Sequence, residues 1–239
     1  MSVRREGHQE LAADELMKAF ADPNATAQYA ERVPRFVPGL ADMHRMASIL
    51  LAERVGAEGR VLVLGAGGGM ELKAFAEAHP RWTFDGVDPA PEMLKQAERS
   101  LGPLAARVRL HQGYIDDAPD IAFDGAACLL TLHFLAHDER RGTAAAIRRR
   151  LKPGAPFVAA HSSFPQGHDE RRRWLSRYAA FALASGADPD HVRNAHDAVE
   201  RHLNVFEPNQ DEAILREAGF SDVTLFYAAF TWRGWVAYA

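Results

Sequence analysis

Three spaced glycines and one aspartate are the residues of this sequence whose types and spacing best suit ligand binding. Gly65, Gly67 and Gly69 follow the apolar run 61–64, and Asp88 ends a second apolar run beyond a helical segment. Glycine allows a sharp turn at positive φ and lets a ligand lie against backbone N–H groups at a helix start. An acid at the end of the second strand can accept hydrogen bonds from a ribose diol. The stretch therefore predicts a nucleotide-binding strand–loop–helix–strand unit.

The glycine spacing separates two classes of cofactor. The dinucleotide fingerprint is G-x-G-x-x-G, whose last glycine would fall at Met70, whereas this chain has G-x-G-x-G. In this pattern and in the later segments, the sequence resembles the class I S-adenosylmethionine-dependent methyltransferases. The alternative is a structural glycine-rich turn in another α/β protein. The resemblance implies that S-adenosyl-L-methionine is the cofactor and that its binding residues include Gly65, Ala66, Gly67, Gly69, Asp88 and Pro89.

Composition narrows the possible functions. A length of 239 residues suffices for one large α/β domain with a cap, and a net charge of −4 argues against a broad electrostatic grip on nucleic acid. Two arginine triplets, 148–150 and 171–173, are more simply solvated helix faces than a polyanion site. One cysteine, Cys128, excludes a disulfide framework, and no residues have metal-ligand spacing. Without a signal peptide or a membrane-length apolar run, the expected location is cytoplasmic and no membrane partner is expected.

The segment before the glycine loop is expected to hold one end of the cofactor. Residues 1–28 suggest a loosely held helix with apolar Leu11, Leu16, Met17 and Phe20, the segment 29–40 reads as extended and turning, and helical spacing continues over 40–55. In the resembling family, such segments fold over the methionine end of the cofactor. Candidates for its carboxylate are therefore Tyr29, Arg32 and Arg35, since the arginine fork matches a carboxylate; surface arginines are the alternative.

Residues beyond Asp88 are candidates for the adenine. In the family, the residue at Met93 lies beside the adenine, although here it could equally belong to the core. The family has an acid after the glycine that this chain has at position 113, whereas Tyr114 and Ile115 stand here. These two side chains could enclose a purine, and the acceptor for its amino group would be Asp116 or backbone.

The remaining pattern completes a sheet. Apolar runs predict strands at 108–111, 123–130, 156–160, 223–227 and 230–238, the last two antiparallel, and a helix at 209–217. The string Ile147–Ala155 is close to the family turn R-x-L-K-P-G-G. The expected fold is α/β: a Rossmann-like doubly wound seven-stranded sheet with an antiparallel last strand and a helical insertion before strand six.

One domain, 1–239, is expected, in four parts. A helical segment, 1–56, precedes a cofactor-binding core, 57–160; a helical cap, 161–206, precedes a C-terminal helix and strand pair, 207–239. The cap carries two helical patterns separated by Gly186, and it could roof the methyl-transfer site or form a homodimer interface. Its aromatic stripe is more often core than substrate cage.

Two segments are similar to the carboxy-S-adenosylmethionine synthase branch, namely 35–39 with the following helix and the tail from 203. Positions tied to the special chemistry of that branch differ. Leu40 replaces a tyrosine, Leu129 replaces an asparagine at the cofactor, and the expected arginine falls near Val199, with Arg201 close by. The resemblance therefore implies a related methyltransferase, with carboxymethyl-donor chemistry as an outside alternative.

Methyl transfer from a sulfonium is an in-line displacement, so positioning can supply much of the rate and a base is not obligatory. His133, after the fourth strand, and His161, after the fifth, are the candidate catalytic bases; structural histidines are the alternative. Three functions remain open: a methyltransferase acting on a small molecule, an enzyme acting on tRNA or a nucleotide, and a non-catalytic cofactor-binding protein. The sequence does not identify the acceptor.

Overall fold

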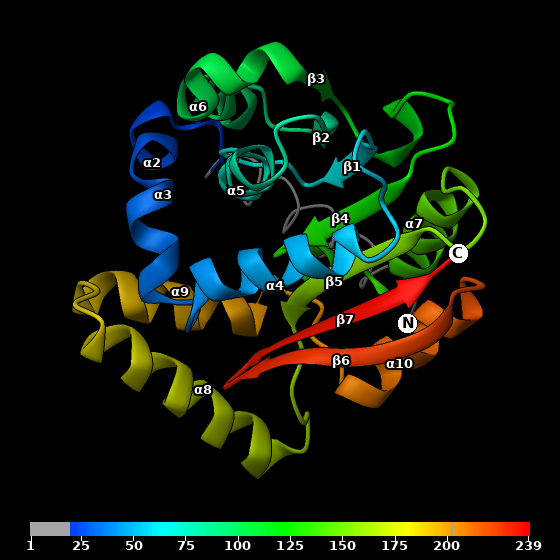
Figure 1. Ribbon diagram of the computed structural model, residues 1–239. Helices are drawn as coiled ribbons and strands as arrows, with labels where there is room; N and C mark the ends of the chain where they lie inside the picture. The colour runs from blue at the N-terminus through cyan, green and yellow to red at the C-terminus, as the bar shows by residue number, and fades with distance from the viewer. Residues whose placement is uncertain (1–19, 202) are drawn as a thin grey trace.

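A seven-stranded sheet in the order β3-β2-β1-β4-β5-β7-β6 forms the centre of the molecule (Figure 1). The computed structural model describes residues 20–201 and 203–239. The strands are β1 (Arg60–Leu64), β2 (Thr83–Asp88), β3 (Val108–Gln112), β4 (Gly125–Leu129), β5 (Pro156–Ser162), β6 (Ser221–Ala229) and β7 (Trp232–Tyr238). The helices are α2 (Pro23–Ala27), α3 (Tyr29–Arg32), α4 (Leu40–Ala52), α5 (Met70–Ala78), α6 (Pro91–Leu101), α7 (His137–Arg149), α8 (His168–Ala184), α9 (Pro189–Arg201) and α10 (Pro208–Glu217). Short 3-10 helices are η1 (Val33–Arg35), η2 (Gly102–Arg107), η3 (Ile115–Asp117) and η4 (Leu132–Phe134).

The strand directions place one edge of the sheet where a ligand can bind. Strands β1 to β5 are mutually parallel, and β7 is antiparallel to both β5 and β6. The strand order reverses at the β1–β4 pair, whose register joins Val61 to Gly125 and Val63 to Ala127. Ligands of open α/β sheets bind outside the carboxyl ends of the strands at such a reversal. The predicted fold class is confirmed, including the antiparallel strand and the insertion before β6.

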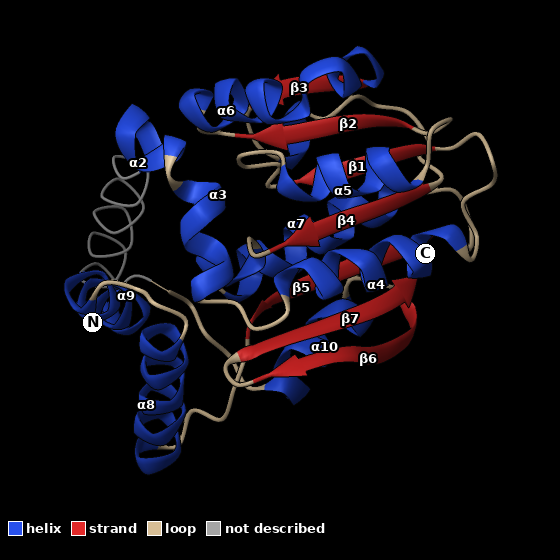
Figure 2. Ribbon diagram, turned by 60° about the vertical axis from the view of Figure 1, so that its left-hand side comes forward, coloured by secondary structure: helices blue, strands red, loops and turns tan. Residues whose placement is uncertain are grey.

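Alternating strand residues supply both faces of the core. In β1, Val61 and Val63 join a cluster with residues of α4 and α5, whereas Leu62 and Leu64 join a second cluster with residues of α7 and α10. Side chains of a strand point alternately to the two faces, so a fully apolar β1 is what a strand covered on both sides requires. The sheet is therefore the middle layer of three (Figure 2).

The insertion forms a helical hairpin. Gly186, at φ 78°, separates α8 from α9, and Asp188 Oδ1 accepts the backbone N–H groups of Asp190 and His191 at 2.8 and 3.2 Å, which starts α9. Figure 2 shows α8 and α9 beyond the edge toward which the arrows of β2 and β4 point. The hairpin, hereafter the cap, thus lies on the carboxyl side of the parallel strands.

The cap packs through its aromatic residues. The Tyr178 ring centre lies 5.8 Å from that of Phe36 and 6.5 Å from that of Trp232, and the rings of Phe181 and Phe230 lie 5.9 Å apart. These partners belong to the segment after α3 and to the β6–β7 turn region. The described part of the aromatic stripe is therefore largely core.

The segment 29–40 departs from the prediction, because it is helical and not extended. It forms α3 and η1, and Pro34 occupies an early position of η1, where the missing N–H of proline is not needed. Gly39, at φ 64°, then begins α4. The predicted helix over 40–55 ends at Ala52.

Of the four apolar residues named for the predicted N-terminal helix, Phe20 lies within the described residues. Its ring contacts those of Tyr29 and Phe134 edge-on, at centroid distances of 6.4 and 6.1 Å. Leu11, Leu16 and Met17 lie outside the described residues. Within the described ranges, no helix is long and apolar enough to cross a membrane.

Candidate functional site

The loops after β1 and β4 meet at the strand-order reversal. A Cβ atom on Gly65 would come within 1.9 Å of Thr131 Oγ1, so only glycine allows the two loops to touch. Beside Thr131, Leu130 adopts φ 57°, and its N–H donates to the Ala160 carbonyl at 2.6 Å. Non-glycine residues held at positive φ cluster at functional sites, because the surrounding structure must stabilise the strain. Among the described residues, Leu130 is one of three such residues, with Asp222 and Phe230, and it is the one in the loop after β4.

The glycine loop has the geometry that the spacing predicts. Gly65, Gly67 and Gly69 have φ values of 73°, 48° and 78°. At Gly69, which caps α5, a Cβ atom would lie 2.9 Å from the Ala97 Cα, so this glycine also permits close packing on α6. Ala66 is fully buried, and its N–H donates to the Val87 carbonyl. The loop is thus held firmly between β1, β2 and α6.

Asp88 lies at the end of β2, beside the loop. Its Oδ2 accepts the Gly67 N–H and its Oδ1 accepts the Ala90 N–H, each at 2.9 Å. Burial raises the pKa of the carboxyl above its ordinary value, partly opposed by these two hydrogen bonds. Each carboxylate oxygen still has a second lone pair, so the side chain can accept hydroxyl hydrogen bonds as well.

Helix α3 lies over the loop. A Cβ atom at Gly68 would lie 3.5 Å from Cδ1 of Tyr29, which places the tyrosine ring against the loop backbone. Arg32 is three residues further along α3, so it shares the face of Tyr29. Arg35, in contrast, donates from Nη1 to the Gly186 carbonyl at 2.9 Å, in the turn of the cap. The structure thus brings Tyr29 to the loop and directs Arg35 to the cap, and Arg32 ends the short helix that carries Tyr29.

The predicted adenine contacts divide into buried and exposed residues. Met93 is 3% exposed, and its Cε would be 3.4 Å from a Cβ atom on Gly67. Ile115 is also buried, whereas Tyr114 is 62% exposed and donates its N–H to Asp117 Oδ2 at 2.8 Å. Asp117 therefore organises this turn.

Two further predicted contacts flank the site. Pro89 is half-buried immediately after Asp88, and Leu129 is buried at the end of β4 within the hydrophobic core. An aliphatic side chain at Leu129 offers no hydrogen bond, so it can contribute shape only.

Glu71 is a buried acid that the sequence analysis missed. It lies in the first turn of α5 and is 7% exposed, and burial raises the pKa of its carboxyl to about 8, with Asp88 adding to the rise. Burial raises the pKa of the Tyr29 hydroxyl, and the negative charges of Glu71 and Asp88 raise it further. The available signal was an acid directly after the glycine trio, a position where exposed acids are common because of the helix dipole.

His133 follows β4 in η4 and is buried. Its Nδ1 accepts the Ser162 N–H at 3.2 Å, which fixes the neutral ring as the Nε2–H tautomer. Burial, followed by the charges of His161 and Arg140, lowers its pKa well below the ordinary value. His133 is therefore neutral near pH 7, with the lone pair of Nδ1 already in use.

His161 was predicted to follow the fifth strand, but it lies within β5, which continues to Ser162. The side chain is 1% exposed, and its Nε2 lies 3.1 Å from Oδ1 of Asp211, a residue of α10. Asp211 also pairs with Arg140 of α7, whose side chain is 1% exposed. Arg140 in turn donates to the carbonyls of Leu135 and Asn204. His161 thus belongs to a buried charged cluster, here named the Arg140 cluster and defined as Arg140, His161 and Asp211.

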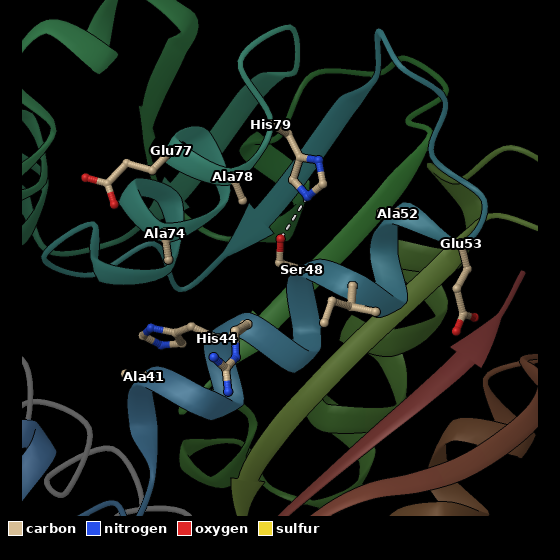
Figure 3. A pocket seen from close by; sticks show the side chains of 11 residues that line it. Ala41, His44, Ser48, Ala52, Glu53, Ala74, Glu77, Ala78 and His79 are labelled. Atoms are coloured by element: carbon tan, nitrogen blue, oxygen red, sulfur yellow. Dashed lines mark hydrogen bonds between the residues drawn. The ribbon is translucent and has the colours of Figure 1, made fainter.

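A separate pocket lies between α4 and α5, away from the glycine loop (Figure 3). It has a volume of about 560 Å³ and is lined by helix residues that include His44, Ile49 and Glu77. Figure 3 shows Ser48 and His79 facing each other across it, with 2.8 Å between Oγ and Nε2. His79 also stacks on Trp82, with 3.6 Å between ring centres. The Ser48–His79 bond therefore links the two helices that cover this face of the sheet.

The residues at the carboxyl edge fit S-adenosylmethionine. Gly67 and Gly68 keep the loop backbone free of side chains, Asp88 can accept a ribose diol, and Glu71 is an acid suited to a cationic ligand. Arg32 on α3 can receive a carboxylate. Among the described residues, no group of three or more His, Cys, Asp or Glu side chains could hold a metal ion.

Comparisons with known proteins agree with this fit. Residues 62–157 match the family model "Methyltransferase domain". The chain is 24% identical to a carboxy-S-adenosyl-L-methionine synthase of Actinobacillus succinogenes, over 90% of this chain and 91% of that protein. Its structure is similar to human N-acetylserotonin methyltransferase, solved in complex with S-adenosylmethionine, with a TM-score of 0.61 and 16% identity over all of this chain and 67% of that one.

An O-methyltransferase family protein of Burkholderia thailandensis gives a TM-score of 0.63 at 17% identity, over 92% of this chain. This chain spans only 61% of the length of that protein. At these identities, the solved structures show that the fold is shared. The family match over residues 62–157 and the relatives support the predicted class I S-adenosylmethionine-dependent methyltransferase.

Proposed function

We propose that this class I S-adenosylmethionine-dependent methyltransferase methylates a small molecule bound between the glycine loop and the cap. The observation that carries the proposal is the position of the cap, which lies beyond the carboxyl ends of the parallel strands and is joined to the segment after α3 (Figure 2). A roof built from the chain itself favours an acceptor small enough to be enclosed. The net charge of −4 gives no general attraction for nucleic acid.

The cofactor residues can be given separate roles. Gly65, Gly67 and Gly69 shape the loop, Asp88 receives the ribose diol, and Arg32 receives the methionine carboxylate, with Tyr29 packed on the loop beside it. Met93, Pro89 and Ile115 form the buried side of the adenine site, and Tyr114 is exposed where it can close over the ring. The burial of Met93 and Ile115, the approach of Tyr29 to the loop and the hydrogen bond of Asp88 to Gly67 support these roles.

The bound sulfonium supplies an activated methyl group, and the chain supplies its surroundings. Because the Nδ1 of His133 accepts a backbone N–H, this ring presents an N–H donor and not a base. His161 is held against Asp211 inside the Arg140 cluster. We therefore assign methyl transfer to positioning and exclusion of water, with His133 and His161 as supports of the acceptor side of the site.

A second candidate, the synthesis of carboxy-S-adenosyl-L-methionine, is favoured by the relatives that bear this name over nearly their whole length. The substitutions at Leu40 and Leu129 argue against it, since both residues are buried and offer neither charge nor hydrogen bond. Mass spectrometry of cofactor recovered from the protein distinguishes the two, because a carboxylated cofactor is heavier.

The test begins with cofactor binding. Calorimetry of S-adenosylmethionine against Asp88→Ala should show affinity reduced by about tenfold to a hundredfold, because hydrogen bonds to a charged acceptor are lost. Asp120→Ala, an exposed acid outside the site, is the control and should bind like wild type. Equal affinity of wild type and Asp88→Ala would contradict the pocket assignment.

Turnover then tests the acceptor. Methyl-labelled cofactor is incubated with pooled small metabolites, with tRNA, and with neither. Label transferred to a metabolite supports the proposal, and label in tRNA would replace it with the nucleic-acid alternative. No labelled product in any pool would favour a cofactor-binding protein without turnover.

A further inference from the structure

Glu71 differs from the other buried acids of the described chain. Asp85 accepts hydrogen bonds from Arg60 at 2.5 and 3.0 Å and contacts His111 at 2.8 Å, and Asp211 pairs with Arg140. Asp88 accepts two backbone N–H groups. For Glu71, the hydrogen-bonding group within the described ranges is its own backbone N–H. It is thus the buried acid for which no other residue of this region provides a partner.

Glu71 is buried next to the glycine loop, in the first turn of α5. The residue follows the glycine loop by two positions, and its charge acts on Asp88 at the end of β2, on Tyr29 over the loop and on Cys128 in β4. Asp88 and Cys128 belong to β2 and β4, the two strands that pair with β1.

A cation at this point would be stabilised by the Glu71 carboxylate. A buried carboxylate without a partner is costly, and the group responds by staying protonated, as its pKa of about 8 reflects. Basic residues stabilise Asp85 and Asp211, but within the described ranges no salt bridge reaches Glu71. A ligand with a positive charge would ionise Glu71 and compensate for its burial.

The cofactor carries two positive charges, the sulfonium and the α-ammonium of its methionine part. We propose that Glu71 binds the α-ammonium, while Arg32 faces the carboxylate of the same group. An ammonium donates three hydrogen bonds, which a carboxylate can accept, whereas a sulfonium donates none. The proposal rests on S-adenosylmethionine as cofactor.

A proton balance follows from this role. Near pH 7 the free protein holds a proton on Glu71, and formation of the ammonium–carboxylate pair releases that proton to the buffer. No bond other than this O–H bond is broken. Binding should therefore release a proton even with S-adenosylhomocysteine, which has the α-ammonium but no sulfonium.

The experiment is calorimetry with S-adenosylhomocysteine at pH 7 in buffers of different ionisation enthalpy. Wild type should release up to about one proton, whereas Glu71→Gln should release almost none and bind roughly tenfold to a hundredfold more weakly. The probe 5′-methylthioadenosine lacks the amino-acid group, so both proteins should bind it equally. Glu77→Gln, an exposed acid on the same helix, is the matched control.

The outcomes separate this proposal from the broader assignment. Unchanged affinity and proton release in Glu71→Gln would overturn the role of Glu71 while leaving the cofactor intact. Equal weakening of both ligands would also overturn it, because a general distortion of the site would then explain the loss. Absence of any binding by wild type would overturn the cofactor assignment. Thermal unfolding of the free variants verifies folding, and Glu71→Gln should melt no lower than wild type.

Discussion

Two groups of buried charged residues lie on either side of the β1–β4 pair, and they differ in whether the acids have basic partners. At the glycine loop, Glu71 and Asp88 are two acids without a basic partner among the described residues. In the Arg140 cluster, Asp211 has both Arg140 and His161. Burial alone would raise the pKa of Asp211, but these neighbours hold it below its ordinary value. The first pair has no basic partner within the described residues, whereas Asp211 lies beside two basic side chains.

The difference separates binding from structure. The Arg140 cluster joins α7, α10, β5 and the carbonyls of Leu135 and Asn204, so its charges connect parts of the chain to one another. Within the described residues, no salt bridge joins Glu71 to another part of the chain, and we propose that its partner is the bound ligand. A buried charge that the fold has already paired therefore indicates a structural role, and one left unpaired at a loop indicates a binding site.

The largest effect is expected on the structural side of the comparison. Arg140→Leu leaves Asp211 and the two carbonyls buried without their donor, so the free energy of unfolding should fall by about 3–5 kcal/mol. Urea denaturation measures this change. Arg141→Leu, a half-exposed neighbour on the same helix, should change stability by less than about 0.5 kcal/mol. Similar stability of the two variants would show that the Arg140 cluster does not hold these segments together.

The pH dependence of stability should distinguish the two groups next. Glu71 has a folded pKa of about 8 against an ordinary 4.5, so the folded state holds its proton more tightly than the unfolded state. Its contribution is complete below pH 4.5 and is lost as the pH rises to 8, with a slope of up to ~1.4 kcal/mol per pH unit.

Urea denaturation of free wild type and Glu71→Gln at several pH values measures this contribution, because the other titrating groups are common to both proteins. Between pH 5 and 7, the variant should gain about 2 kcal/mol relative to wild type. Saturating S-adenosylhomocysteine should reduce the fall seen in wild type. A constant difference between the two proteins at all pH values would show that Glu71 is ionised in the free protein.

The smallest effect is expected in the α4–α5 pocket, which belongs to neither charged group. Ser48→Ala removes the hydrogen bond to His79 and should lower the free energy of unfolding by about 1 kcal/mol. The affinity for S-adenosylhomocysteine should stay the same, because the pocket lies away from the glycine loop. Calorimetry and urea denaturation check the two parts. Weaker cofactor binding in this variant would indicate coupling between the pocket and the site.

Local signals made the loop predictable. Gly65, Gly67 and Gly69 each have a positive φ. Glycine adopts this conformation readily, so its presence in the sequence indicates such a turn. Apolar runs likewise located the seven strands, because β1 to β5 need apolar residues on both faces. The helical state of 29–40 was missed, because its two prolines indicate an extended chain unless they fall at the start of a 3-10 turn.

Non-local contacts decided the side chains of the site. His161 was expected at a strand end, but β5 extends two residues beyond the predicted limit at Ala160 and includes it. Arg35 looked equivalent to Arg32 until the fold placed the Gly186 carbonyl beside it. The roles of His133, His161 and the cofactor residues, the single-domain organisation and the homodimer stay predictions.

The sequence by itself determined the sheet, the glycine loop and the class of cofactor, because φ preferences, apolar periodicity and the place of Asp88 are properties of short segments. Only the tertiary structure decided which charges are paired. Glu71 and Asp211 are both acids in the first turns of helices, and nothing in their local sequence distinguishes them. Their difference arises because α10 packs against Arg140 and His161, whereas α5 begins beneath the loop, where a positive charge comes with the ligand.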